Sequence, residues 1–171
     1  MRTIKIVSFI AVLLLFFNCK NNKNTNQLVL NIDAVIQKTD SINVYYTESK
    51  SINFTDSQSY WTKLTGNKKN QKIQIVFPDS ILPKQIRLDF GRNLSQNDVV
   101  LNKMDFTYKN KSFSVKGKEI FYIFRVDENN SVLDKLNGSI KRKNSKQING
   151  PSLYPKGDKL FNRLNQLYSK K

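Results

Sequence analysis

Few side chains in this sequence could do chemistry. Its 171 residues include no histidine and a single cysteine. Histidine is the side chain best suited to proton transfer near neutral pH, so its absence excludes Ser-His-Asp and Cys-His catalysis and every metal site that histidine ligates. Carboxylate-pair hydrolysis and Ser-Lys chemistry survive on composition, but there is no G-x-S-x-G elbow and no glycine-rich phosphate loop. We therefore expect no catalytic residue, no metal site and no cofactor.

The one cysteine, Cys19, directly follows an apolar segment. Arg2 and Lys5 precede residues 6–17, which are apolar except for Ser8. This run is shorter than the roughly 20 residues that span a membrane as a helix, but it is typical of a signal peptide. The stretch Leu15-Phe16-Phe17-Asn18-Cys19 resembles a lipobox, although Phe16 and Asn18 replace its usual leucine and small residue. The resemblance implies a bacterial lipoprotein, cleaved after residue 18 and acylated on Cys19; an ordinary secretory signal or an uncleaved anchor are the alternatives.

This interpretation divides the chain into three parts. Residues 1–18 are the predicted signal peptide, residues 19–26 a lipidated, polar tether, and residues 27–171 one domain. The first partner is then a lipid bilayer, through the acyl chains on Cys19. Lys20, rather than the aspartate that retains many lipoproteins at the inner membrane, follows the cysteine. We expect the protein in the cell envelope, at the outer membrane and facing the periplasm.

Most of the domain alternates between apolar and polar residues, as half-buried β-strands do. The apolar positions are Leu28, Leu30 and Ile32; Ile42, Val44 and Tyr46; Ile73, Ile75 and Phe77; Ile86, Leu88 and Phe90; Met104, Phe106 and Tyr108; and Phe113 and Val115. These short segments, with turn residues between them, predict a single antiparallel β-sandwich or jelly roll.

Two segments depart from this alternation. Residues 119–126 are apolar on both faces, which predicts a central strand or a short buried helix. Residues 156–169 predict an amphipathic helix, because Leu160, Phe161, Leu164, Leu167 and Tyr168 follow helical spacing. We expect this C-terminal helix to pack on the sandwich; the alternative is a helix lying on a membrane surface.

Residues 71–91 carry a second resemblance. A strand at residues 71–77, a turn reaching Pro83, and a strand from Ile86 to Gly91 containing Arg87 and Asp89 resemble galactose-binding-like β-sandwich modules of envelope and glycan-handling proteins. The resemblance extends over roughly residues 40–125 and implies the sandwich fold more than any activity.

Five residues are candidates for ligand binding. Arg87 and Asp89 share one strand face and could present a charged pair to a polar ligand; the alternative is that they pair across strands or fix the turn before Gly91. Tyr45 is expected to face outward, and Tyr60 and Trp61 to lie in a Ser/Gln/Thr-rich loop, where aromatic rings could stack on a sugar. The alternative is that these rings pack into the core.

The charge of the chain is strongly positive, at +16, and the excess grows toward the C-terminus. Lys141, Arg142, Lys143 and Lys146 form its densest run and could contact anionic lipid, lipopolysaccharide or acidic polysaccharide. The alternative is a solvated hairpin tip. Nucleic acid is not an expected partner of an exported protein.

Together these features predict a membrane-anchored, non-catalytic envelope lipoprotein that serves as a binding or accessory module for a glycan or a partner protein. One alternative is a structural lipoprotein that contacts anionic envelope components through its basic surface. Another is a carboxylate-based glycan hydrolase, which would need two carboxylates about 5–10 Å apart in a cleft.

Overall fold

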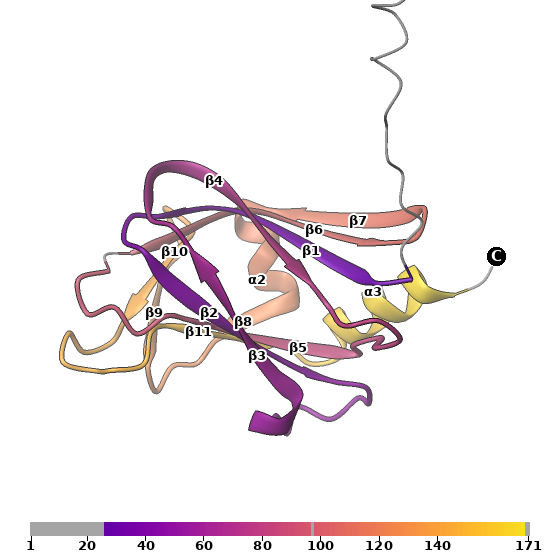
Figure 1. Cartoon of the computed structure of the whole chain (residues 1–171). Coiled ribbons are helices and arrows are strands. Elements are labelled where there is room, and N and C mark those ends of the chain that lie inside the picture. Colours follow the sequence, from indigo (N-terminus) through magenta and orange to yellow (C-terminus); the bar gives the residue numbers. More distant parts are fainter. Residues whose placement is uncertain (1–25, 97, 170–171) are drawn as a thin grey trace, which may run out of the picture.

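The computed structural model describes residues 26–96 and 98–169, which form two antiparallel sheets packed face to face (Figure 1). The predicted signal peptide, Cys19 and the tether up to residue 25 lie outside the described residues. No helix within the described residues has the length and apolar character needed to span a membrane.

Sheet A and sheet B divide the strands as follows. Sheet A has the order β4 (Asn67–Val76), β1 (Leu28–Ile36), β6 (Val99–Tyr108), β10 (Ser139–Arg142) and β9 (Ser131–Asp134), with β7 (Lys111–Lys116) also pairing with β6. Sheet B has the order β3 (Ser59–Leu64), β2 (Asp40–Thr47), β5 (Gln85–Phe90), β11 (Ser152–Pro155) and β8 (Phe124–Val126). This arrangement confirms the predicted mainly-β sandwich.

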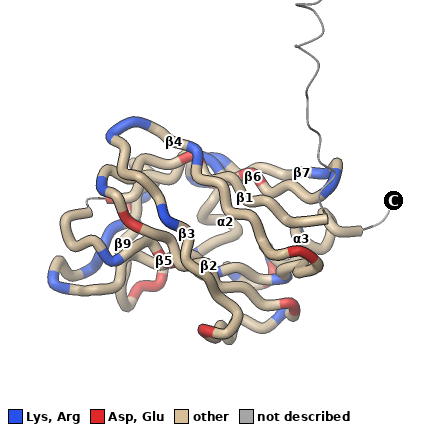
Figure 2. Tube along the Cα trace, viewed as in Figure 1, with Lys and Arg blue, Asp and Glu red and all other residues tan. Residues whose placement is uncertain are grey.

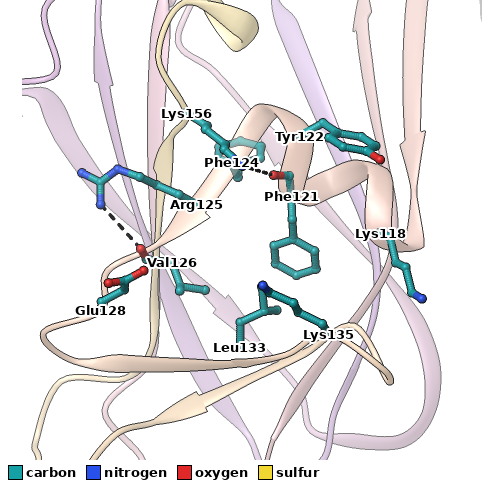
Figure 3. Close-up of a pocket in the computed structure, with 10 residues that line it drawn as sticks. All are labelled: Lys118, Phe121, Tyr122, Phe124, Arg125, Val126, Glu128, Leu133, Lys135 and Lys156. Carbon is teal, nitrogen blue, oxygen red and sulfur yellow. Dashed lines mark hydrogen bonds between the residues drawn. The ribbon is translucent and has the colours of Figure 1, made fainter.

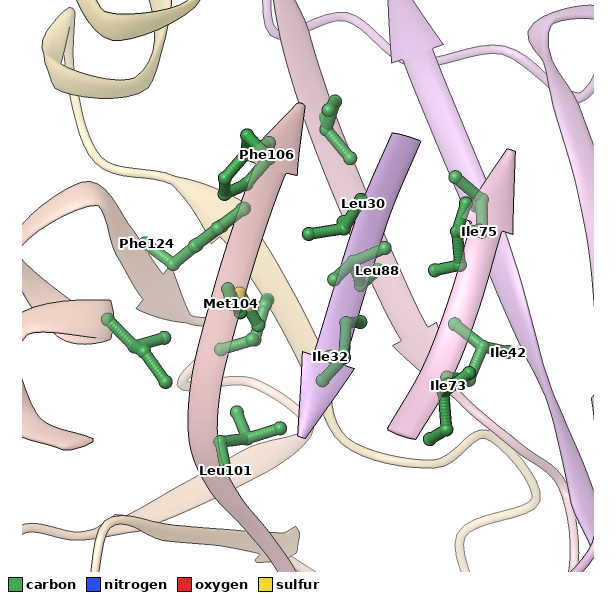
Figure 4. Packing of buried hydrophobic residues seen from close by; sticks show 14 of the residues in the cluster. Leu30, Ile32, Ile42, Ile73, Ile75, Leu88, Leu101, Met104, Phe106 and Phe124 are labelled. Atoms are coloured by element: carbon green, nitrogen blue, oxygen red, sulfur yellow. The ribbon is translucent and has the colours of Figure 1, made fainter. Parts of the chain in front are cut away.

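The hydrophobic core lies between the sheets, where the predicted apolar positions meet (Figure 4). In β1, every second residue from Leu28 to Ile36 is buried. Met104 and Phe106 of sheet A and Ile42 and Leu88 of sheet B are completely buried. All buried apolar residues of the core lie between Leu28 and Leu167, so this stretch supplies the whole core of the described domain.

The chain crosses between the sheets twice at one corner of the sandwich, from β1 to β2 and then back from β3 to β4. Ile36 pairs with Asn67 in sheet A, and Asp40 pairs with Leu64 in sheet B. Gly66 lies in the crossing from β3 to β4, directly against the backbone of the crossing from β1 to β2. A β-carbon on Gly66 would lie 2.5 Å from the carbonyl oxygen of Gln37. Only glycine fits this close approach of two backbones.

The C-terminal helix, α3 (Lys159–Tyr168), closes an edge of the sandwich. Leu160, Leu164 and Leu167 are buried in the core. The hydroxyl of Tyr168 donates a hydrogen bond to the carbonyl of Pro83 at 2.9 Å. The prediction that this helix packs on the sandwich is confirmed.

Residues 119–126, which are apolar on both faces, form both a short helix and a short strand. A 3-10 turn, η3 (Gly117–Glu119), leads into a single helical turn, α2 (Ile120–Ile123), and then into β8. The alternative of a central strand is wrong, because β8 is the last strand of sheet B. The segment is apolar because Ile120, Ile123 and Phe124 are all buried where the two sheets end.

Candidate functional site

The outer face of sheet B carries an unusual group of side chains. Along β2, β5 and β11 the residues that point away from the core include Tyr45, Arg87, Asp89 and Tyr154. Tyr45 is paired directly with Arg87 in the sheet. Phe54, from the loop after β2, contacts both tyrosine rings. We call these five residues, together with Trp61, the aromatic–arginine face.

Arg87 lies at the centre of this face. Its Nε and Nη2 donate to the two carboxylate oxygens of Asp89 at 2.8 and 2.6 Å. The guanidinium lies 4.7 Å from the ring centroid of Tyr45 and 4.5 Å from that of Tyr154, which places it between two aromatic faces. Burial acts to lower the pKa of Arg87, but the hydrogen bonds and charge of Asp89 outweigh it and raise that pKa. Arg87 is therefore a fixed cation, and the predicted charged pair exists.

The aromatic rings around Arg87 hold one another in place. Phe54 meets the ring of Tyr45 edge-on at 6.4 Å and that of Tyr154 at 5.9 Å. The Tyr45 hydroxyl donates to Asp56 at 3.0 Å. Burial is the main cause of a raised pKa for both tyrosines. Both phenols therefore stay protonated at neutral pH and act as hydrogen-bonding groups rather than as acids.

Trp61 extends the same face toward the edge of sheet B. Asn43 is paired with Trp61 on one side and with Asp89 on the other, so all three share the outer surface. Trp61 is 45% exposed, and the guanidinium of Arg92 lies 5.0 Å from its ring. The Oδ1 of Asn43 is buried and has no hydrogen-bond partner. An acceptor thus remains unsatisfied between Trp61 and the Arg87–Asp89 pair.

Tyr60 does not belong to this face. Both Tyr60 and Trp61 were predicted in a loop, but they lie in β3, where neighbouring residues point to opposite sides of the sheet. The Tyr60 ring packs edge-on against the buried Phe77 at 6.0 Å, and its hydroxyl donates to the carbonyl of Val76 at 3.2 Å. Tyr60 is therefore a packing residue, the alternative that the sequence had left open.

Sequence reasoning missed two members of the site, Phe54 and Tyr154. Tyr154 belongs to a four-residue strand, too short to show an alternating pattern. Phe54 lies in an irregular loop. The available signal was weak: Phe54 is an aromatic residue in the mainly polar stretch 51–56, whereas Tyr154 stands between Leu153 and Pro155 and nothing marks it locally.

The basic run is only partly the exposed patch that was expected. Lys141, Lys143 and Lys146 are exposed, whereas Arg142 turns inward from β10. The Nε and Nη2 of Arg142 are buried without a hydrogen-bond partner, and burial lowers the pKa of its guanidinium, against a smaller opposing effect of Asp40. The expectation that all four side chains are exposed together is therefore wrong for Arg142, because strand alternation places it on the core side.

A separate hollow of about 350 Å³ lies at the edge of the sandwich, between α2, β8 and β9 (Figure 3). Glu128 is the single carboxylate among the residues that line it. Within residues 26–96 and 98–169, no group of three His, Cys, Asp or Glu side chains is placed to hold a metal ion.

In comparisons with known proteins, no family model, no curated protein and no solved structure matches this chain.

Proposed function

We infer that this protein is a non-catalytic binding module of the bacterial cell envelope, anchored by lipid on Cys19, and that its aromatic–arginine face binds a glycan. The observation that carries this proposal is the composition of that face. Four aromatic side chains and a paired arginine lie on the outside of sheet B, where they add nothing to the core between the sheets.

The chemistry of the face suits a sugar. Sugar rings have an apolar side that packs on aromatic rings, and hydroxyls that need donors and acceptors. Arg87 commits Nε and Nη2 to Asp89, which leaves Nη1 to donate to a ligand. Arg92 and Arg125 stack beside the rings of Trp61 and Tyr154 and add positive charge. We therefore propose that an acidic glycan binds better than a neutral one.

The arrangement of carboxylates supports binding rather than hydrolysis. The edge hollow contains one carboxylate, Glu128. On the aromatic–arginine face, both oxygens of Asp89 accept hydrogen bonds from Arg87, and a further carboxylate at its margin, Asp56, accepts one from the Tyr45 hydroxyl. Glycoside hydrolysis by the usual route needs a second carboxylate that is free to act as acid, base or nucleophile.

The sole tryptophan of the chain makes the proposal testable. Because Trp61 lies on the proposed surface, its fluorescence should change when acidic oligosaccharides are titrated into residues 20–171. Tyr154→Ala should weaken binding roughly tenfold, the effect of about 1.4 kcal/mol. Tyr122→Ala, which removes an exposed tyrosine elsewhere, should leave binding unchanged. If Tyr154→Ala and Tyr122→Ala behave alike, or if no oligosaccharide changes the fluorescence, the proposal is wrong.

The exposed lysines support a second candidate, a structural lipoprotein that contacts anionic envelope components. Lys141, Lys143 and Lys146 are exposed in and after β10, which pairs with β9, and Figure 2 shows basic segments in blue near β9. Binding to anionic vesicles should then occur at low salt and be lost by roughly 0.5 M, since the Debye length falls to about 3 Å at 1 M. Changing the three lysines to glutamine should remove it, and binding that persists at high salt would contradict this candidate.

A further inference from the structure

The hollow at the edge of the sandwich has an apolar floor. Sheet B ends at β8 and sheet A ends at β9, and α2 lies beside both, so the space between the last strands stays open. Phe124 and Val126 are buried at its base, and Phe121 and Leu133 are half-buried along its walls. Figure 3 shows the Phe121 side chain directed toward the side chains of Leu133 and Lys135.

The rim of the hollow is cationic. Lys118, Arg125, Lys135 and Lys156 line it and are all exposed, against the one carboxylate of Glu128. Among the described residues, none of these four cations lies within 4.0 Å of a carboxylate. Lys156 instead donates to the backbone carbonyl of Phe121 at 3.4 Å, and Arg125 to that of Val126 at 3.5 Å. The rim therefore has positive charge that no acidic side chain of residues 26–96 and 98–169 pairs with directly.

An apolar floor beneath unpaired cations is complementary to one class of small molecule. A ligand that fills the floor must have a hydrocarbon body, since burial of polar groups without partners costs free energy. A ligand that satisfies the rim must carry an anionic head, which can form charge-assisted hydrogen bonds with lysine. The volume of about 350 Å³ is near the lower end of the roughly 300–1,000 Å³ typical of ligand pockets.

We propose that this hollow is a binding site for a free medium-chain carboxylate of the fatty-acid type. The hydrocarbon chain lies on Phe121 and Leu133 above the buried base, the carboxylate meets Lys135, and Lys118 and Lys156 add positive charge at the rim. This site differs from the aromatic–arginine face, although Arg125 lies between them, on the rim of the hollow and beside Tyr154.

Calorimetric titration of residues 20–171 with decanoate, below its micelle-forming concentration, tests the proposal. Decanoate should bind, whereas acetate, which lacks the body, and decyltrimethylammonium, which has the opposite charge, should not. The variant Lys118→Gln/Lys135→Gln/Lys156→Gln should bind decanoate at least roughly tenfold more weakly, equivalent to about 1.4 kcal/mol. Arg125 is left unchanged, because its guanidinium also lies 5.1 Å from the Tyr154 ring.

Two control variants separate a pocket from general attraction to a basic protein. Lys68→Gln/Lys69→Gln/Lys72→Gln on β4 removes the same charge from exposed positions elsewhere and should bind decanoate like the wild type. Leu133→Ser, which makes one wall of the hollow polar, should weaken decanoate binding without changing the circular dichroism spectrum. Equal losses in the two lysine variants, unchanged binding in Leu133→Ser, or no binding to the wild type would each overturn the proposal.

Discussion

Arg87 and Arg142 are both partly buried arginines in strands, but their surroundings differ. Arg87 has Asp89 as a bidentate partner and an aromatic ring on each side. Two nitrogens of Arg142 are buried with no acceptor. A buried ionic group without a partner costs stability, so removing such a group costs little. Removing one member of a buried pair is costly, because it leaves the other charge uncompensated.

The two arginines should therefore respond in opposite ways to the same substitution. We expect Arg142→Met to leave the free energy of unfolding unchanged or to raise it by about 1 kcal/mol, because an unsatisfied donor disappears. Arg87→Met should lower it by about 2 kcal/mol, because Asp89 stays partly buried without its cation. Urea denaturation of both variants measures the difference. A loss of stability in Arg142→Met that matched the loss in Arg87→Met would mean that Arg142 has a partner in solution.

Asp105, on the outer face of sheet A, gives a prediction about pH. Partial burial acts to raise the pKa of its carboxyl, but hydrogen bonds from Lys103 and Ser114 outweigh burial and lower that pKa overall. A carboxyl whose pKa is lower in the folded state contributes stability above its unfolded pKa. That contribution is lost as the pH falls through the folded value. Asp105→Asn should therefore reduce stability at neutral pH and weaken its dependence on pH below about 4, as measured by denaturation across the acid range.

The sequence predicted the Arg87–Asp89 pair but not the environment of Arg142. Residues two apart in a strand share a face, so the first pair follows from local geometry alone. Arg142 lies in a run of basic residues that favours an exposed turn, but β10 pairs with β6 at Ile140, two residues earlier, and alternation along β10 puts Arg142 on the same inward side as Ile140. Tyr154 joins the site through a similar long-range pairing, between β11 and β5, which no local pattern contains.

At the level of elements, helix α3 and strand β3 show what periodicity can and cannot predict. The three buried leucines of α3 recur at helical spacing, so its existence and its buried face were both predicted. β3 is an edge strand, and the Ser/Gln/Thr-rich sequence that leads into it favoured a loop, although Tyr60, Trp61 and Thr62 are residue types enriched in strands. Its hydrogen bonds to β2 outweigh that weak local preference.

The packing of α3 can be measured by a matched pair of substitutions. Leu164→Ala removes a fully buried side chain and should lower the free energy of unfolding by about 3 kcal/mol, within the range for core leucines. Asn162→Ala, on the exposed side of the same helix, should change it by no more than about 0.5 kcal/mol. Equal effects would mean that α3 does not pack on the sandwich in solution.

At the level of the whole molecule, the proposed lipid anchor has a direct test. Metabolic labelling with a fatty acid should tag the wild-type protein, because Cys19 would carry the acyl chains. Cys19→Ser should remove the label, and the protein should move from the membrane fraction to the soluble fraction. Equal labelling of both proteins would show that the lipobox-like segment does not direct acylation.

The start of β1 and the basic residues after β10 lie at opposite ends of the sandwich. Leu28, the first residue of β1, is paired with Tyr108, the last residue of β6. The strand β10, which precedes Lys143 and Lys146, is paired with β6 at Val99 and Val100, the opposite end. β6 has 10 residues, and at about 3.3 Å per residue it separates these two ends by roughly 30 Å.

For a protein attached to a bilayer through Cys19, this arrangement limits how far the lysine-rich end can lie from the membrane. Residues 20–26 could extend over at most roughly 25 Å, at about 3.5 Å per residue. With the tether fully extended, an upright domain would present its lysine-rich end up to about 50 Å from the bilayer surface, far beyond the roughly 8 Å Debye length at physiological salt. Those lysines would be electrostatically independent of the membrane that holds the protein and free to meet whatever layer lies opposite. In a Gram-negative envelope that end of the molecule would then face the layer opposite the anchoring membrane.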